Sequence, residues 1–292
     1  MLTVQEVQER SPYRHKLDIT RYASIMAEQP DRDKVSEKYQ FLGAKQIIPL
    51  FADLNFYPFV ISESRAVKEG NNAFTKHAIT FMNPDMEKSL SPRVGEVFPT
   101  VKMYGSHDGT MAWQGFLEAW RVWCKNGCAT PTTLAGGKAK HIGEQFYAIV
   151  AEIINSMMAQ IPHLQRKITD WSNITMHQDE KVALAEAAIE LRYDKESGVY
   201  VDPREMLRTR RPQDRADDLW TTYSVVQENL IKGGVRAYRQ ADNGRYRLNN
   251  GTRVRKQGVK GITSVTEDKR LNQALWTLTE TMENLKKGRA VA

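Results

Sequence analysis

Residues 97–128 read Val97-Phe-Pro-Thr-Val-Lys-Met-Tyr104, then Gly105-Ser-His-Asp-Gly-Thr110, then Met111-Ala-Trp-Gln-Gly-Phe-Leu-Glu-Ala-Trp-Arg-Val-Trp-Cys-Lys-Asn-Gly-Cys128. The first part is rich in β-branched and aromatic residues and predicts a strand, and the glycines of the second part predict a turn. Apolar residues of the third part recur at helical spacing: Trp113, Phe116, Leu117, Trp120 and Cys124. This spacing predicts a helix over 110–124 that buries Trp113, Phe116 and Trp120 and is capped by Asp108 or Thr110.

The segments on either side of this stretch extend the pattern. A helix that begins near Tyr39, a strand over 56–67 and a strand over 74–82 precede the third strand. The predicted order is α-β-β-β-α, and the predicted fold class is α+β, with a small antiparallel sheet flanked by helices and a mainly helical C-terminal half. Residues 129–140 contain several helix breakers and no periodicity, so we expect a linker there. A long helix should follow and end or kink at Pro162.

The predicted domain organisation has four parts. Residues 1–36 form an N-terminal arm, and residues 37–130 form the α-β-β-β-α core. Residues 131–203 form a helical segment, and residues 204–292 carry a basic segment and C-terminal helices that pack on the core. Three of the predicted helices in the C-terminal half run from 178 to 193, from 219 to 230 and from 266 to 287.

The composition excludes several classes of protein. The sequence contains neither an apolar run of eighteen residues nor a signal-peptide pattern, so we expect a cytoplasmic protein with no membrane partner. Cys124 and Cys128 have no matching pair of histidines, which argues against a zinc site. Gly136-Gly137-Lys138 lacks the first glycine and the hydroxyl residue of a phosphate-binding loop. We therefore expect no metal and no cofactor.

The positive charge of the chain is concentrated in one segment. The net charge is +7, and residues 232–260 contain nine cations against one acid, Asp242, so this segment carries +8 and the remainder −1. These cations cannot be neutralised locally, which indicates an external polyanion, and Tyr238 and Tyr246 could stack unpaired bases. The predicted nucleic-acid-binding residues are Arg208, Arg210, Arg211, Lys232, Arg236, Arg239, Arg245, Arg247, Arg253, Arg255, Lys256 and Lys260.

Ser106, His107 and Asp108 supply the hydroxyl, imidazole and carboxylate of a nucleophilic triad. Adjacent residues of one turn cannot all face one another, because the base must reach the nucleophile and be oriented by a third group from elsewhere. We therefore predict a structural turn with no catalytic residue. A hydrolase built on this turn is kept as an alternative.

Several spaced motifs occur together in this chain: Ser106-His-Asp-Gly-Thr, Cys124-Lys-Asn-Gly, Arg210-Arg-Pro, Val226-Gln-Glu-Asn-Leu-Ile-Lys-Gly-Gly, Val259-Lys-Gly-Ile and Leu271-Asn-Gln-Ala-Leu-Trp. Over roughly residues 40 to 285 the chain resembles the phage/plasmid-like family known as domain of unknown function 932. The resemblance implies a gene carried by bacteriophages, plasmids and other mobile elements, without an established activity. Lys125 and Cys128 depart from the usual form of the Cys-x-Asn-Gly motif, in which Ser and an aliphatic residue are typical.

The predicted core order is also similar to that of the phage single-strand annealing proteins of the RecT, Red-beta and Erf types, which assemble into rings or filaments. We therefore expect a non-enzymatic protein that binds DNA, single strands in particular, and acts as a homo-oligomer in recombination or replication. The alternative outside the enzyme class is an anti-defence protein of the anti-restriction type that binds a host protein.

Overall fold

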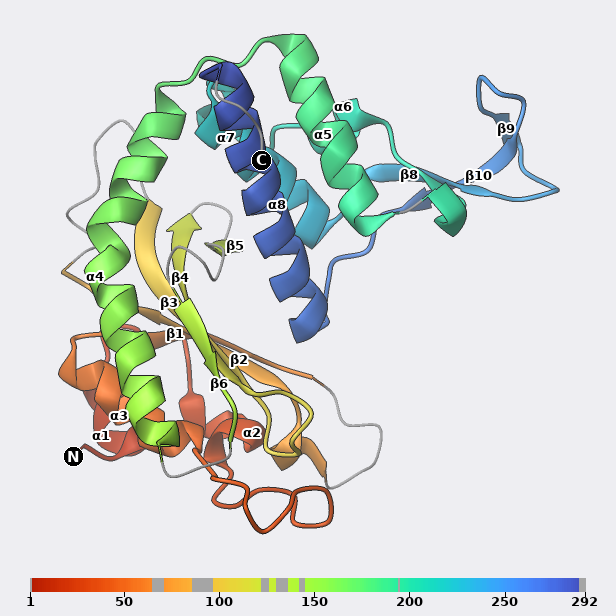
Figure 1. Ribbon diagram of the computed structural model, residues 1–292. Coiled ribbons are helices and arrows are strands. Elements are labelled where there is room, and N and C mark those ends of the chain that lie inside the picture. The colour runs from red at the N-terminus through yellow and green to blue at the C-terminus, as the bar shows by residue number, and fades with distance from the viewer. Residues whose placement is uncertain are drawn as a thin grey trace. The chain divides into compact units, whose positions relative to one another are not determined.

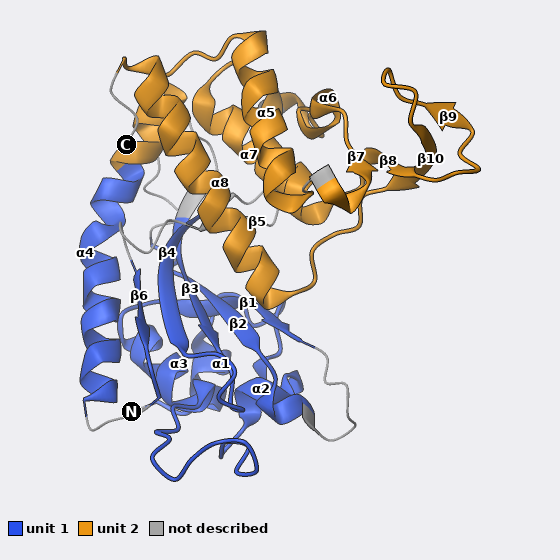
Figure 2. Ribbon diagram, turned by 45° about the vertical axis from the view of Figure 1, so that its right-hand side comes forward, with its two compact units in different colours: residues 1–165 blue, residues 166–292 orange. Residues whose placement is uncertain are grey.

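The computed structural model describes residues 2–64, 71–85, 97–121, 126–129, 136–141, 145–193 and 195–288 (Figure 1). The chain divides into two compact units, unit 1 over Met1–Gln165 and unit 2 over Arg166–Ala292 (Figure 2). Unit 1 combines helices with an antiparallel sheet, and unit 2 is mainly helical with a second sheet. The predicted α+β class is confirmed.

Short helices precede the sheet of unit 1. They are α1 (Val4–Arg10), α2 (Ala23–Met26) and α3 (Ala44–Asp53). Val7 and Ile25 are fully buried, so residues 1–36 contribute to the core of this unit. Phe51 of α3 stacks on Phe81 of the sheet with ring centroids 4.2 Å apart, which fixes the amphipathic helix against the strands.

The sheet of unit 1 is antiparallel throughout and has the order β1-β2-β3-β4-β5, with β6 also paired to β4. Its strands are β1 (Tyr57–Glu63), β2 (His77–Met82), β3 (Val97–Gly105), β4 (Trp113–Arg121), β5 (Asn126–Ala129) and β6 (Gly136–Ala139). The three predicted strands correspond to β1, β2 and β3. The predicted linker over 129–140 is wrong in part, because β5 ends at Ala129 and β6 covers 136–139.

The predicted helix over 110–124 is wrong, because its described part contains strand β4. Leu117 lies opposite Val101 and Gly115 opposite Met103 in the register with β3. Leu117 and Phe116 therefore point to opposite faces of the sheet, and both are fully buried. A strand buried on both faces loses its polar alternation, and its apolar residues then match a helical stripe by coincidence.

The burial predicted for this segment is confirmed for Trp113 and Phe116. The Trp120 side chain and Cys124 lie outside the described residues. The described elements from 44 to 121 have the order α-β-β-β-β, so the predicted α-β-β-β-α order is wrong, and the likeness to annealing proteins that was based on it is not confirmed.

Helix α4 (Phe146–Ser172) follows the sheet of unit 1 and continues through Pro162. A Cβ at Gly115 would lie 2.9 Å from Met157 Cε, and one at Gly137 would lie 2.6 Å from Ile153 Cγ1. Glycine at these two positions therefore lets α4 approach β4 and β6 closely. Gly136-Gly137-Lys138 therefore lies in strand β6, paired to β4.

Unit 2 packs its helices around buried aromatic rings. Trp171, Trp220, Tyr223 and Trp276 form this cluster, and the Trp171 indole N–H donates to Glu283 over 2.8 Å. The helices of the unit after α4 are α5 (Gln178–Arg192), α6 (Pro203–Met206), α7 (Leu219–Lys232) and α8 (Val265–Lys286).

The second sheet has the order β7-β8-β10-β9 and is antiparallel. Its strands are β7 (Val199–Tyr200), β8 (Arg236–Gln240), β9 (Tyr246–Arg247) and β10 (Arg253–Gly258). The basic segment thus forms β8, β9 and β10, with β10 between the other two strands, and β7 extends the sheet. Across the described residues, no helix is both long and apolar enough to span a membrane.

Candidate nucleic-acid interface

The basic sheet begins directly after helix α7, where Gly233 and Gly234 have positive φ angles of 67° and 76°. The Gly234 N–H donates to the Val259 carbonyl over 2.7 Å, and the Val259 N–H donates to the Val235 carbonyl over 3.0 Å. A Cβ at Gly233 would lie 2.4 Å from the Val259 carbonyl oxygen, so this crossing requires glycine. The start of β8 is thereby tied to the end of β10.

Two arginines hold this root of the sheet from the loop before α7. Arg210 donates through Nε and through one terminal nitrogen to Asn229 Oδ1, over 3.1 and 3.0 Å, and also donates to the Gly233 carbonyl. Asn229 in turn donates to the carbonyls of Met206 and Arg208, over 2.9 Å each. A single amide side chain thus joins the loop to the last turn of α7.

Arg211 binds two buried carboxylates, Glu228 at 2.6 Å and Asp214 at 2.9 Å. Lys232 also contacts Glu228, at 2.9 Å. Burial alone would raise the pKa of Glu228, but the hydrogen bonds from Arg211 and Lys232 outweigh burial and lower it below its usual value. The carboxylate therefore stays ionised and paired.

Three of the six motifs that carry the family resemblance meet at this root. Arg210-Arg-Pro, Val226 to Gly234 and Val259-Lys-Gly supply the interlocking groups just described. Arg192 of α5 adds hydrogen bonds to the carbonyls of Leu230 and Lys260. These contacts tie the root of the sheet to α5, α7 and the loop before α7, and we call them the mount of the sheet.

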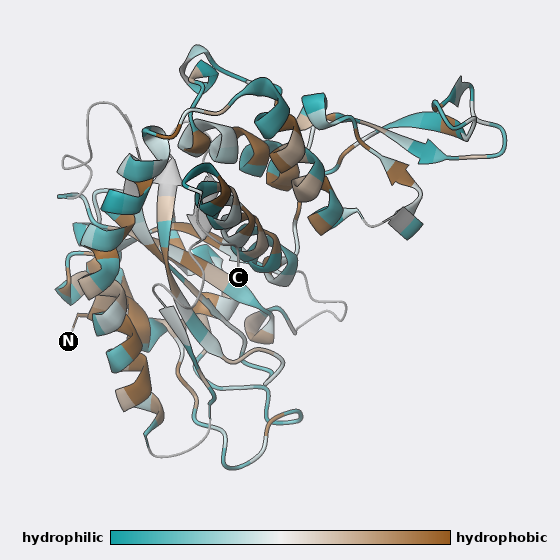
Figure 3. Ribbon diagram, turned by 45° about the horizontal axis from the view of Figure 1, so that its top comes forward, coloured by the Kyte–Doolittle hydropathy of each residue, from teal (hydrophilic) through white to brown (hydrophobic). Residues whose placement is uncertain are grey.

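The two faces of the sheet differ in chemistry. Directly opposed residues of an antiparallel pair point to the same face. Arg255 opposes Arg239, and Arg253 opposes Arg247, so these four arginines share one face, which we call the arginine face. Tyr200 opposes Tyr238, and the same face carries Tyr246, Val254 and Lys256; we call it the tyrosine face. Figure 3 shows the strands and turns of this sheet mostly in teal, the colour of hydrophilic residues.

The cations of the arginine face repel one another without compensation. All four side chains are exposed, and none of them forms an ion pair within the part of the chain that the structure describes. Arg247 and Arg253 donate only to main-chain carbonyls, those of Gly251 at 3.4 Å and Asp242 at 3.2 Å. Like charges directly opposite each other destabilise a sheet. An arrangement of this kind suits an external polyanion.

A pocket of about 540 Å³ opens on the tyrosine face. Its lining consists of Tyr200, Tyr238, Tyr246, Arg247, Leu248, Asn249, Asn250 and Val254. The rings of Tyr238 and Tyr246 meet edge to face with centroids 5.7 Å apart, and Tyr246 is 50% exposed. The volume is within the range of pockets that hold small organic groups.

The structure divides the predicted binding residues into two groups. Arg208, Arg210, Arg211 and Lys232 contact carbonyls, an amide or carboxylates of unit 2, and Arg236 lies 3.8 Å from Glu205. The remaining predicted residues are exposed and form no ion pair within the described ranges: Arg239, Arg245, Arg247, Arg253, Arg255, Lys256 and Lys260. Tyr200 was not among the predicted residues, although Val199-Tyr200 after a glycine was an available strand signal.

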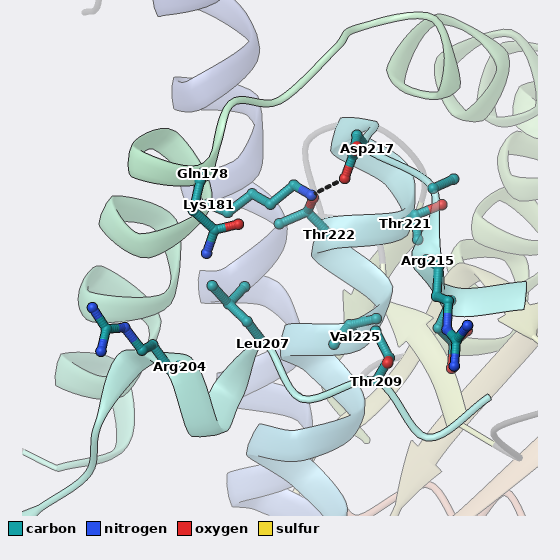
Figure 4. A pocket seen from close by; sticks show the side chains of 12 residues that line it. Gln178, Lys181, Arg204, Leu207, Thr209, Arg215, Asp217, Thr221, Thr222 and Val225 are labelled. Atoms are coloured by element: carbon teal, nitrogen blue, oxygen red, sulfur yellow. Dashed lines mark hydrogen bonds and ion pairs between the residues drawn. The ribbon is translucent and has the colours of Figure 1, made fainter. Parts of the chain in front are cut away.

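A second pocket of unit 2, of about 410 Å³, lies beside α5 and α7 (Figure 4). Lys181, Arg204 and Arg215 contribute to its lining. Lys181 is paired with Asp217, which lowers the pKa of that carboxyl. The lining also contains the carboxylates of Asp214 and Asp217, so this pocket mixes both signs of charge, unlike the arginine face.

The Ser106–Thr110 segment is a turn between β3 and β4, so the predicted helix cap is wrong. The Ser106 hydroxyl accepts from the Met111 N–H over 3.0 Å, and Asp108 accepts from the Thr110 N–H and hydroxyl, over 3.1 and 2.6 Å. His107 Nε2 lies 2.9 Å from the Ser24 carbonyl oxygen. Among the contacts of this turn within the described residues, none joins Ser106 to His107.

Burial governs the histidines around this turn. The rings of His77 and His107 lie 4.8 Å apart, and both residues are buried. Burial lowers the pKa of His77 to about 3 and that of His107 to about 4. A neutral His107 can act here as an anchor between the turn and the segment that contains Ser24. Within the described ranges, no group of three or more metal-ligating side chains is suited to a metal ion.

Fold and site together define an α+β protein that carries an exposed cationic sheet on its mount. The chain belongs to the family described as "Domain of unknown function (DUF932)", whose model matches residues 33–276. The chain is 28% identical over 250 residues to "UPF0380 protein YafZ" of Escherichia coli (strain K12), a match that covers 85% of this chain and 83% of the relative.

The same identity and coverage apply to "UPF0380 protein YfjQ" of the same organism. No solved structure matches the chain. The family resemblance is confirmed. Neither the family description nor the names of the relatives state an activity.

Proposed function

We propose that the protein binds nucleic acid without catalysing a reaction, and that the basic sheet is the interface. The observation that carries this proposal is the presence of two pairs of directly opposed arginines, Arg239 with Arg255 and Arg247 with Arg253, on an exposed face. Phosphates of a nucleic-acid backbone would neutralise this repulsion and release counterions. The mount favours binding because it fixes the root of the strands that carry these arginines before the ligand arrives.

The preferred ligand in this proposal is single-stranded DNA, and the preferred role is binding or annealing in recombination or replication of a mobile element. Phosphate contacts alone are sequence-tolerant, as such a role requires. The exposed tyrosine beside the arginines offers a stacking surface to unpaired bases. A homo-oligomer would line up several such sheets along one strand, so oligomerisation is part of the proposal.

A gel-shift salt series with single-stranded and duplex oligonucleotides tests the proposal. Changing Arg239, Arg247, Arg253 and Arg255 to Gln should weaken binding of every sequence alike. The slope of log affinity against log salt should fall by about 0.7 for each phosphate that the variant no longer neutralises, or about 2–3 units in total.

The control variant removes four exposed cations elsewhere: Arg32, Lys38, Lys140 and Arg166, each changed to Gln. It alters the net charge equally, so an unchanged slope in the control would locate the effect at the basic sheet. A wild-type protein that binds no oligonucleotide at low salt would exclude the proposal and favour a protein partner, as in the anti-defence alternative.

A further inference from the structure

The pocket on the tyrosine face is built from all four strands of the basic sheet. Tyr200 comes from β7, Tyr238 from β8, Tyr246 from β9 and Val254 from β10. Val254 is fully buried, whereas the Tyr246 ring is half exposed. The pocket therefore combines an apolar wall with an accessible aromatic ring, which suits a flat partly apolar group.

The positive charge beside the pocket decides whether a cationic or an anionic ligand fits it better. Aromatic pockets often bind organic cations, because the ring faces attract positive charge. Here Lys256 directly opposes Tyr238 on the same face, whereas the Arg247 side chain belongs to the arginine face. The Lys256 cation disfavours a cationic ligand and favours a flat group that is attached to an anion.

The turn after β9 adds polar groups that can form hydrogen bonds with the edge of a flat ligand. Asn249 and Asn250 line the pocket. Asn250 Oδ1 accepts from the Thr252 N–H over 3.1 Å, and its side-chain NH₂ is a donor group. Amide groups of this kind can pair with the hydrogen-bonding edge of a nucleobase.

We infer that the pocket binds one unpaired nucleobase, stacked on Tyr246, while the adjoining phosphates contact the arginine face. This inference rests on the proposed function. Tyr246 and Arg247 are successive residues of an edge strand and point to opposite faces. A single nucleotide at that edge can place its base on one face and its phosphate on the other. A duplex cannot do so, because its bases are paired and stacked inside.

Oligonucleotides with and without bases separate the two kinds of contact. The probes are a thymidine oligomer and an abasic oligomer of the same length, which carry equal phosphate charge. The wild-type protein should bind the thymidine oligomer roughly 5- to 100-fold more tightly if one base is stacked. Tyr246→Leu should reduce this ratio to near one, Tyr246→Phe should retain it, and both should keep the salt slope.

Tyr147→Leu is the matched control, because Tyr147 is 47% exposed and lies outside the basic sheet. Its ratio should equal that of the wild type. Equal wild-type affinity for the two oligomers, with a steep salt slope, would overturn the inference and leave the proposed function standing. A ratio unaffected by Tyr246→Leu would also overturn it. Binding of neither oligomer at low salt would overturn the proposed function and the inference with it.

Discussion

The two sheets of this protein are both antiparallel, yet they are built for different purposes. In the sheet of unit 1, all six residues of β2 are buried, and the central strand β4 has large apolar side chains on both faces. In the basic sheet, Ala237 and Val254 are the fully buried residues of β8 and β10, and most of the other residues are exposed. Burial of apolar side chains therefore stabilises the sheet of unit 1. The stability of the basic sheet depends instead on the hydrogen bonds of its mount. The cations of the second sheet have little part in folding, which leaves them available for a ligand.

The largest loss of stability should follow from a substitution in the core of unit 1. Trp113→Ala should lower the free energy of unfolding by about 3–5 kcal/mol, because it removes a large side chain that is 1% exposed. Tyr246→Ala in the basic sheet should cost much less, since half of that ring is exposed. Urea unfolding of both variants measures the difference. Equal losses of unfolding free energy in the two variants would contradict the view that apolar burial stabilises only the sheet of unit 1.

The pH dependence of stability should differ between the units. The pKa of His107 in unit 1 falls from its usual 6.5 to about 4 through burial, so the unfolded state binds the proton more readily. This contribution is present above pH 6.5 and is lost as the pH falls toward 4, at most about 3 kcal/mol in total.

In unit 2, hydrogen bonds from Lys167, Lys287 and Trp171 outweigh burial and lower the pKa of Glu283 from 4.5 to about 2. Its contribution is present above pH 4.5 and is lost only as the pH falls toward 2. Unfolding measured from pH 7 to pH 3 should therefore show a decline above pH 4.5 that His107→Gln reduces and Glu283→Gln leaves in place. A decline that His107→Gln does not change would contradict the assignment.

The mount of the basic sheet should be the next most sensitive region. Arg211→Ala leaves Glu228 and Asp214 buried without one of their charged partners, and Lys232 compensates only in part. We expect a loss of about 2–4 kcal/mol and faster amide exchange in β8 and β10. Arg204→Ala, which changes an exposed arginine of the same unit, is the control. Unchanged exchange in Arg211→Ala would show that the sheet does not depend on its mount.

The sequence predicted strands β1 to β3 of the unit 1 sheet, but it located the basic sheet only as a charged segment. The reasons for this difference are physical. Gly115 in the middle of the supposed helix was the available warning at β4, because glycine disfavours a helix interior by about 1 kcal/mol. Strands β1 to β3 and helices α5, α7 and α8 kept their usual periodicity and were predicted close to their observed bounds. Charge counting located the basic segment, but only the register of β8, β9 and β10 reveals which cations share a face. The internal role of Arg210 and Arg211 depends on contacts with α7 that the local sequence does not encode.

The smallest effect on stability should come from the residues we assign to binding. Changing Arg239, Arg247, Arg253 and Arg255 to Gln removes two directly opposed pairs of like charges. Each such pair destabilises a sheet by roughly 0.2–1 kcal/mol, so the variant should unfold at the same temperature as the wild type or slightly higher. High salt should remove any gain, because exposed charges are screened within about 10 Å at 0.1 M salt.

Thermal unfolding in low and high salt measures this effect alongside the loss of DNA binding. A protein that becomes more stable when its binding arginines are removed retains them at a cost to its own fold, which only a ligand can offset. Destabilisation of the quadruple variant by more than about 1 kcal/mol would instead give these arginines a structural role. The two sheets would then differ in exposure alone, and the assignment of the basic sheet as an interface would lose its main support.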